Sequence, residues 1–192
     1  PETLRIAKAF ATPVIVDSAL RDGSLRSEAE KCEIPVLTYE AGEALRFDPL
    51  SISAGVLGVQ RVMQAIGMLR ASRKKLPEPI IAKSTSWVRA PGNGILRTVV
   101  NLGDKVEEGE TLAYISSPLG HDELELLAPK GGIVIGQQTL PLVNEGDAIF
   151  HIAYFKQDDD MVEQAVGSYI EGLTEFDVDQ VTTGQIPLET QQ

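Results

Sequence analysis

The sequence predicts an α/β segment followed by a small all-β domain. Strand-like and helix-like apolar patterns alternate over residues 1–69, which is typical of an α/β unit. Over residues 84–155 the helical period disappears, and short apolar runs are separated by glycine turns. One pattern of residues also occurs twice in this second region, which predicts two copies of one β unit.

The first elements follow from apolar runs and a capping residue. Residues 6–10 have the pattern of a helix end, and the apolar run 13–16 predicts a short buried strand. Ser24 precedes a helical stretch over residues 25–30, and its hydroxyl can cap the first turn of that helix.

The next two elements complete the α/β segment. The apolar run 35–39 predicts a strand, and residues 51–69 predict a long helix. Apolar side chains recur three or four positions apart along that helix: Ile52, Val56, Val59, Met63 and Ile66. The order strand, helix, strand, helix predicts a parallel or mixed sheet.

Two polar regions flank the β domain. Residues 70–83 are basic and contain prolines, which predicts a solvated linker, with an anion-binding patch as the alternative. Residues 156–192 predict a helix with an acidic start and an apolar face, followed by an extended tail. We expect the helix to dock on its own fold, and the alternative is a contact in a homo-oligomer.

The β domain contains an internal repeat. Residues 90–96 recur 38 positions later as residues 128–134, and residues 106–112 recur 37 positions later as residues 143–149. The two nearly equal offsets predict a quasi-two-fold sandwich in which neither copy buries its apolar face alone.

This repeat resembles the barrel-sandwich hybrid of biotinyl and lipoyl carrier domains. Such domains carry their cofactor on a lysine at the tip of the hairpin that joins the two halves. Here the hairpin over residues 116–123 contains no lysine, and Lys130 belongs to the repeated Ala-Pro turn. We therefore reject a covalent carrier role and expect a structural or substrate-gating module.

Composition excludes several classes of protein. The 192 residues contain 17 Lys and Arg against 28 Asp and Glu, and the net charge of −11 argues against a general nucleic-acid binder. No apolar run approaches the roughly 18 residues of a membrane span, so we expect no membrane partner. A single cysteine, Cys32, fits a reducing compartment and a cytoplasmic location. Cys32 has no nearby histidine, and we expect a small core or helix-end residue.

Glu40 is the candidate catalytic residue. It directly follows the apolar run 35–39 and precedes a turn at Gly42. Active sites of open α/β sheets lie at such strand ends, where a partly desolvated carboxylate can act as a general base. The alternative is a glutamate that faces solvent or pairs with Arg46. The neighbouring Tyr39 points to the opposite face of a strand and is expected to pack in the core.

Pro35, Thr38, Glu40 and Gly42 form the pattern Pro-x-x-Thr-x-Glu-x-Gly. This pattern, followed by a long helix, a linker and the repeat-containing domain, resembles the succinylglutamate desuccinylase/aspartoacylase family of zinc carboxypeptidase-like deacylases. The resemblance covers residues 1–155. It implies that residues 1–69 are the C-terminal part of an incomplete zinc-hydrolase α/β domain.

The resemblance also implies a reaction, which is hydrolysis of an N-acyl amide bond in a small molecule such as an N-acyl amino acid. In that family zinc polarises the carbonyl and activates a water. The resemblance implies that Glu40 accepts the proton of this water and later donates it to the leaving amine. Arg26 and Arg46 are candidates for holding the substrate carboxylate, because an arginine fork suits a carboxylate. The alternatives are ion pairs of Arg26 with Glu30 and of Arg46 with Glu40 or Glu43.

The histidines depart from the family pattern. His121 and His151 both lie in the β domain, and neither has a second histidine at ligand spacing, whereas catalytic zinc needs about three protein ligands. We expect structural or surface roles for both and assign no metal ligand in this chain. The zinc ligands are expected upstream of residue 1, and the chain alone is expected to be inactive. The competing hypothesis is a non-catalytic binding or oligomerisation module built on the β domain.

Overall fold

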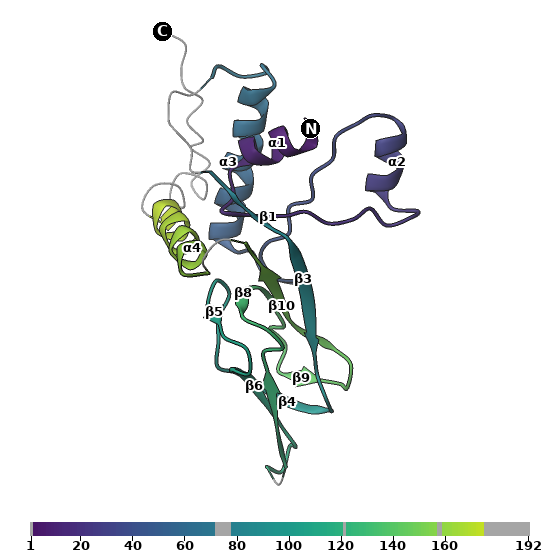
Figure 1. Cartoon of the computed structure of the whole chain (residues 1–192), viewed down its shortest axis with the longest axis vertical. Helices are drawn as coiled ribbons and strands as arrows, with labels where there is room; N and C mark the ends of the chain where they lie inside the picture. Colours follow the sequence, from purple (N-terminus) through teal and green to yellow (C-terminus); the bar gives the residue numbers. More distant parts are fainter. Residues whose placement is uncertain (1, 72–77, 121, 157–158, 175–192) are drawn as a thin grey trace. The chain divides into compact units, whose positions relative to one another are not determined.

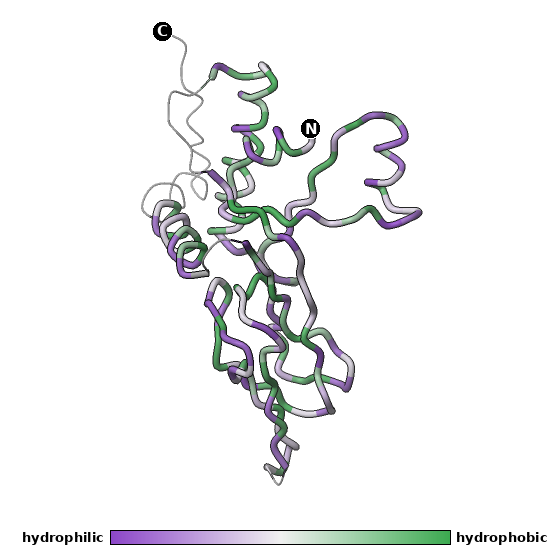
Figure 2. The backbone as a smooth tube through the Cα atoms, in the orientation of Figure 1, coloured by the Kyte–Doolittle hydropathy of each residue, from purple (hydrophilic) through white to green (hydrophobic). Residues whose placement is uncertain are grey.

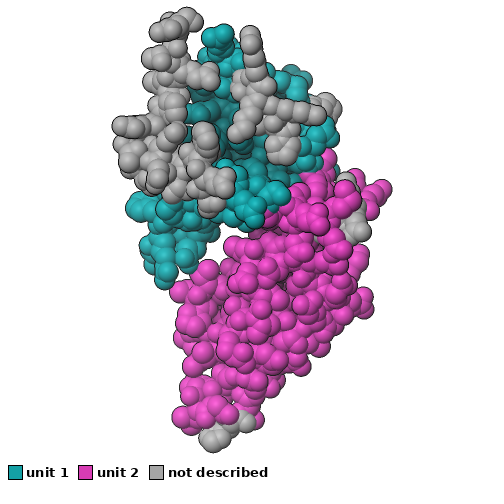
Figure 3. All heavy atoms as spheres, turned by 90° about the vertical axis from the view of Figure 1, so that its left-hand side faces the viewer, with its two compact units in different colours: residues 1–79, 168–192 teal, residues 80–167 magenta. Residues whose placement is uncertain are grey.

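The structure is a computed structural model that describes residues 2–71, 78–120, 122–156 and 159–174 (Figure 1). The chain combines helices with strands, as expected, and its two four-stranded sheets are antiparallel. It divides into two compact units, unit 1 with residues 1–79 and 168–192, and unit 2 with residues 80–167 (Figure 3). His121 lies outside the described residues, as do residues 72–77 of the predicted linker and the predicted tail from residue 175.

Unit 1 begins with three predicted elements: α1 (Glu2–Phe10), β1 (Val14–Val16) and α2 (Leu25–Lys31). The expectation that the strand is buried is wrong, because none of the three β1 residues is buried. Ser24 caps α2 as predicted, because its hydroxyl accepts a hydrogen bond from the Ser27 amide at 3.2 Å. Cys32 is exposed and is the C-cap residue of this helix, which confirms its helix-end role.

The long helix α3 spans Pro49–Ala65 and begins two residues before the predicted start. Asp48 is its N-cap residue, and the carboxylate accepts from the amides of Leu50 at 3.2 Å and Ser51 at 3.3 Å. Pro49 fits the first helical turn because a proline lacks only an amide that the helix would not use there. The helix ends before Gly67, whose φ of +80° is unfavourable for other residues.

The strand predicted over residues 35–39 is wrong, so the predicted order strand, helix, strand, helix is not formed in residues 1–69. The structure assigns no secondary structure to residues 35–39. A strand exists only where a neighbouring strand accepts and donates backbone hydrogen bonds. Among the described residues no backbone hydrogen bond involves this segment, so apolar patterning alone does not make it a strand.

Helices α1 and α3 pack through small residues of α3. Ser53, Ala54 and Gly58 are the buried residues of α3. A Cβ at Gly58 would lie 2.3 Å from the Phe10 ring, so this glycine permits the close approach of the two helices. Arg5 of α1 donates to the Ala65 carbonyl at 3.2 Å and caps the last turn of α3.

Unit 2 consists mainly of two four-stranded antiparallel sheets. One sheet has the order β3-β10-β8-β5 and the other β7-β6-β4-β9. The strands are β3 (Ser84–Arg89), β4 (Gly94–Thr98), β5 (Lys105–Val106), β6 (Thr111–Ser116), β7 (Glu123–Leu127), β8 (Gly132–Gln137), β9 (Leu142–Val143) and β10 (Ala148–Tyr154). The short strand β2 (Ile80–Ala82) precedes them, inside residues 70–83, where the sequence predicts a linker.

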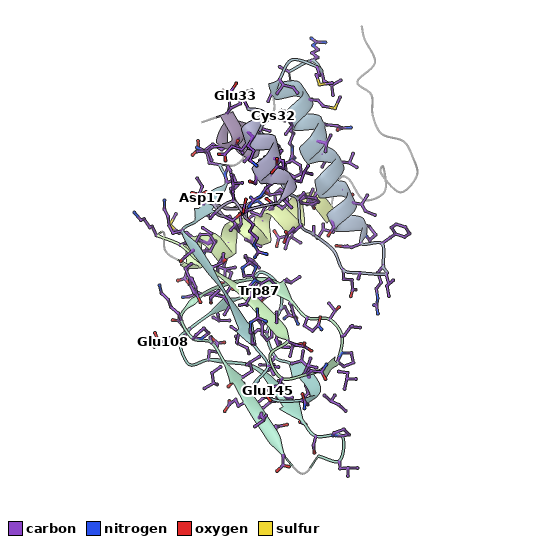
Figure 4. All side chains as sticks on the ribbon, turned by 90° about the vertical axis from the view of Figure 1, so that its right-hand side faces the viewer. Asp17, Cys32, Glu33, Trp87, Glu108 and Glu145 are labelled. Atoms are coloured by element: carbon purple, nitrogen blue, oxygen red, sulfur yellow. The ribbon has the colours of Figure 1, made fainter. Side chains whose placement is uncertain are left out.

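The sequence repeat explains the order of the strands. Strands β3 to β6 contain the first copy and β7 to β10 the second, and each sheet combines strands of both copies. Two equivalent backbone hydrogen bonds join the copies. The Gly109 amide donates to the Ala128 carbonyl, and the Gly146 amide donates to the Ala90 carbonyl, both at 2.9 Å. Glu108 and Glu145, labelled in Figure 4, precede these two glycines. The expected interdependence of the two copies is confirmed.

Both copies contribute to the core of unit 2. Its largest fully buried side chains come from both sheets: Phe150, Leu112, Ile115, Ile133, Ile149 and Ile152. Close packing limits the residue at two equivalent positions. A Cβ at Gly94 would lie 2.6 Å from the Ser116 carbonyl oxygen, and one at Gly132 would lie 2.5 Å from that of Ala153. The buried residues of both copies form one hydrophobic cluster in unit 2.

The predicted C-terminal helix is α4 (Asp159–Thr174). Its first half belongs to unit 2, where Val162 is fully buried. Lys105 of β5 binds this half, since its ammonium lies 2.8 Å from Asp160 and 3.0 Å from Glu107 of its own turn. These carboxylates raise the pKa of Lys105, first through the hydrogen bond to Asp160. The helix docks on its own fold, as the default interpretation predicts.

Candidate functional site

Glu40 lies in an extended segment that is attached to the first turn of α3. On one side of it, the Tyr39 hydroxyl donates to the Ser51 carbonyl at 2.8 Å. On the other side, Gly42 has a φ of +73°, and a Cβ there would lie 3.6 Å from the Ser51 hydroxyl oxygen. The Glu40 side chain, which follows Tyr39, is exposed. The helix start therefore fixes the backbone that carries this carboxylate.

Tyr39 contacts α1 and α3, but it is 40% exposed, so the expectation that it packs in the core is wrong. Its ring centroid lies 5.2 Å from that of Phe10, and a Cβ at Gly55 of α3 would lie 3.0 Å from its ring. Burial raises the pKa of Tyr39, and Tyr169 and the Asp48 carboxylate raise it further. The extended backbone thus directs Tyr39 toward α3 and leaves Glu40 open to solvent.

Arg26 of α2 supports its own loop. Its guanidinium donates to the Ser18 hydroxyl and to the Ala19 carbonyl, both at 3.1 Å. These bonds engage both terminal nitrogens within the loop before α2 and hold the guanidinium there.

Arg46 makes a looser contact. Its Nε lies 3.5 Å from Glu43 Oε1, and its side chain is 75% exposed. This is one of the two pairings that the sequence leaves open. Within the part of the chain that the structure describes, no hydrogen bond or ion pair joins Glu40 to Arg26 or Arg46.

His151 has a structural environment in unit 2. It lies on β10, and its ring stacks on Trp87 of β3 with centroids 4.2 Å apart and planes 9° from parallel. Trp87 is labelled in Figure 4. Across the described residues, no group of three or more His, Cys, Asp or Glu side chains could hold a metal ion. In the same part of the chain, no helix is long and apolar enough to cross a membrane.

Sequence reasoning did not assign a role to two residues that position the site, Asp48 and Ser51. Asp48 determines where α3 begins, and Ser51 accepts the bond from Tyr39 through its carbonyl. The sequence signal for Asp48 is the order Asp48-Pro49, a capping residue before a proline, which is typical of a helix start. The carbonyl of Ser51 has no sequence signal, because any residue carries one.

The fold matches several solved structures. A succinylglutamate desuccinylase/aspartoacylase from Rhodobacter sphaeroides is 26% identical over 80% of this chain, with a TM-score of 0.69. The apo structure of the ectoine utilization protein EutE (DoeB) from Ruegeria pomeroyi is 22% identical over 80% of this chain, with a TM-score of 0.72. An aspartoacylase family protein from Mesorhizobium loti is 19% identical over 82%, with a TM-score of 0.64. No protein-family model and no curated protein sequence matches the chain.

The chain spans about half the length of these structures. It covers 49% of the Rhodobacter chain, 50% of the Ruegeria chain and 48% of the Mesorhizobium chain. The likeness extends over both the α-helical and the all-β parts, since four fifths of this chain align. The resemblance to the succinylglutamate desuccinylase/aspartoacylase family is therefore confirmed, for a chain that corresponds to about half of such a protein.

Proposed function

We propose that this chain is part of a zinc-dependent hydrolase that cleaves an N-acyl amide bond, and that Glu40 is its proton carrier. The observation that supports the proposal is a fold match to a succinylglutamate desuccinylase/aspartoacylase at 26% identity. The pattern formed by Pro35, Thr38, Glu40 and Gly42 supports the choice of Glu40 as the catalytic carboxylate.

The described residues do not fit a zinc site. A catalytic zinc takes about three protein ligands, and no described cluster of His, Cys, Asp and Glu offers them. His151 packs against Trp87 instead. We therefore propose that this chain is inactive alone. The zinc ligands would then belong to the half of the related structures that this chain does not cover.

Glu40 has the geometry of a group that meets its substrate from a fixed backbone. The hydrogen bond of Tyr39 to the start of α3 holds the neighbouring backbone, while the exposed carboxylate can reach a water or an amide nitrogen. In the proposed reaction, Glu40 accepts a proton from the attacking water and donates it to the leaving amine. The carboxylate is then ionised again, ready for the next cycle.

Arg46 is the better candidate for the carboxylate of an N-acyl amino acid. Its contact with Glu43 is long and exposed, so a substrate carboxylate can replace it at little cost. Arg26 would first have to release Ser18 and Ala19. The proposal therefore assigns substrate binding to Arg46 before Arg26.

We propose that unit 2 is a barrel-sandwich hybrid. The interleaved copies and the two antiparallel sheets support this, and the hairpin over residues 116–123 offers no lysine for a covalent cofactor. The second candidate function is a binding or oligomerisation module without catalysis. The hydrophobic cluster within unit 2 favours it, because such a module needs a core of its own.

The test compares two neighbouring carboxylates. It uses this chain combined with the half of the related fold that it does not match. Hydrolysis of a panel of N-acyl amino acids is measured for Glu40→Gln and for the matched control Glu43→Gln. We expect Glu40→Gln to lower kcat by about 100-fold or more, as removal of a general base does. Glu43→Gln should keep activity within a few-fold. Equal activity of the two variants would refute the role of Glu40.

A further inference from the structure

The two copies of the repeat in unit 2 allow equivalent surface positions to be compared. Figure 2 shows apolar residues, in green, along both sheets of this unit. Ile95 of the first copy corresponds to Ile133 of the second, 38 positions later. The next residues, Leu96 and Val134, belong to the hydrophobic cluster between the sheets. Because neighbouring residues of a strand point to opposite faces, both isoleucines lie on the outer faces of their sheets.

These two isoleucines differ in burial. Ile133 is 0% exposed, whereas Ile95 is 45% exposed. Their places in the sheets are equivalent, since Ile133 pairs with Lys105 of β5 and Ile95 pairs with Leu142 of β9. The residue type and the strand pairing are the same, so the difference must come from what covers the outer face of each sheet.

The first half of α4 covers the outer face in the second copy. The Lys105 ammonium lies 2.8 Å from the Asp160 carboxylate, and the Lys105 amide donates to the Glu163 carboxylate at 3.1 Å. A Cβ at Gly103 would lie 3.2 Å from the Val166 side chain, so the helix packs closely there. A helix with apolar side chains and carboxylates therefore accounts for the buried isoleucine beside Lys105.

The equivalent surface of the first copy is apolar and exposed. Leu140 and Leu142 stand 37 positions after Gly103 and Lys105, the two residues that face α4. They are 65% and 69% exposed. We call Ile95, Leu140 and Leu142 the β4–β9 patch. Exposed apolar side chains that lie together usually mark a surface that a partner covers.

A cation lies beside the β4–β9 patch. Arg97 is two residues after Ile95 on β4, so it lies on the same face of the sheet. Its guanidinium stacks on the Tyr114 ring, 4.6 Å from the centroid, and lies 3.7 Å from the Glu123 carboxylate. This ion pair is long and mostly exposed, so a closer carboxylate can replace Glu123 at little cost. The patch therefore complements a partner that combines apolar side chains with a negative charge.

We propose that the β4–β9 patch is a docking surface for an amphipathic helix of another protein, which places apolar side chains on the patch and a carboxylate on Arg97. The cover that α4 provides on the equivalent face of the second copy gives the type of partner. The exposed charge of Arg97 gives the sign of the partner's charge. The inference concerns unit 2 alone and requires neither metal nor substrate.

The test uses the full chain and a defined probe, a peptide with the sequence of α4 (Asp159–Thr174), because this helix covers the equivalent surface. Amide chemical shifts of the isotope-labelled chain are followed by NMR as the peptide is added. We expect saturable changes in β4 and β9 with a dissociation constant of about 1 mM or lower. Tighter binding is not required, because an isolated helix of this length is only marginally stable in water. Absence of binding would overturn the inference, and so would changes confined to β5, which indicate exchange with the chain's own helix.

Three variants separate the docking surface from general effects. Leu142→Asp should weaken binding of the peptide by at least about tenfold, because a charge would be buried in the contact. The matched control Leu119→Asp, at an exposed leucine near the tip of the β6–β7 hairpin, should leave binding unchanged. Arg97→Gln should weaken binding a few-fold and reduce its salt dependence. Equal affinity of the Leu142 and Leu119 variants would overturn the inference, and so would a dimer of the chain alone that covers the patch.

Discussion

At the scale of single residues, the site depends on how an extended backbone distributes its side chains. Tyr39 turns toward α3 and Glu40 toward solvent, as strand-like alternation predicts from sequence. The arginines illustrate the limit of that reasoning. Sequence offers Arg26 and Arg46 equally, but only the structure reveals that Arg26 binds Ser18 and Ala19 while Arg46 has a single long ion pair.

Tyr39 predicts a pH dependence of unit 1. Its folded-state pKa is raised above the ordinary value of 10.0, mainly by burial. The unfolded chain therefore loses the phenol proton first, so the contribution of Tyr39 to the stability of unit 1 is fully present below about pH 10 and is lost as the pH rises further. Tyr39→Phe should remove this part of the alkaline loss. Hydrogen exchange of α3 against pH, in the native chain and the variant, measures it, and identical alkaline profiles would contradict the assignment.

At the scale of elements, capping and packing explain why most helices were predictable. The capping by Ser24 and the apolar spacing of α3 involve residues close together in the sequence, so both can be recognised from the sequence alone. The strand over residues 35–39 was not predictable in the same way. Its pattern is that of a buried strand, but pairing requires a second segment, and no described residue provides one.

Gly58 gives a prediction for the contact between α1 and α3. Ala at this position would place its Cβ 2.3 Å from the Phe10 ring, so the helices must separate or the ring must move. We expect Gly58→Ala to destabilise unit 1 by about 1–3 kcal/mol, as overpacking does. Gly167→Ala in α4, where a Cβ meets nothing within 4 Å, is the matched control and should be neutral or stabilising. Chemical denaturation with exchange of α3 as the readout compares them, and equal stability would contradict the contact.

At the scale of the whole molecule, the two units differ in how far sequence reasoning reaches. The repeat predicts that the two copies depend on each other, and in unit 2 each four-stranded sheet combines strands of both copies. Unit 1 exposes large apolar residues and carries a candidate base without metal ligands among its described residues. These properties fit a protein whose site combines this chain with the remainder of the fold.

The most direct test of this account is the metal content of the purified chain, measured together with amide hydrolysis. The account predicts that the chain alone retains no zinc above background and hydrolyses no N-acyl amino acid, because its described residues offer no set of about three ligands. Addition of the remainder of the fold should bring both metal and activity. One tightly bound zinc per isolated chain, together with amide hydrolysis, would contradict the account.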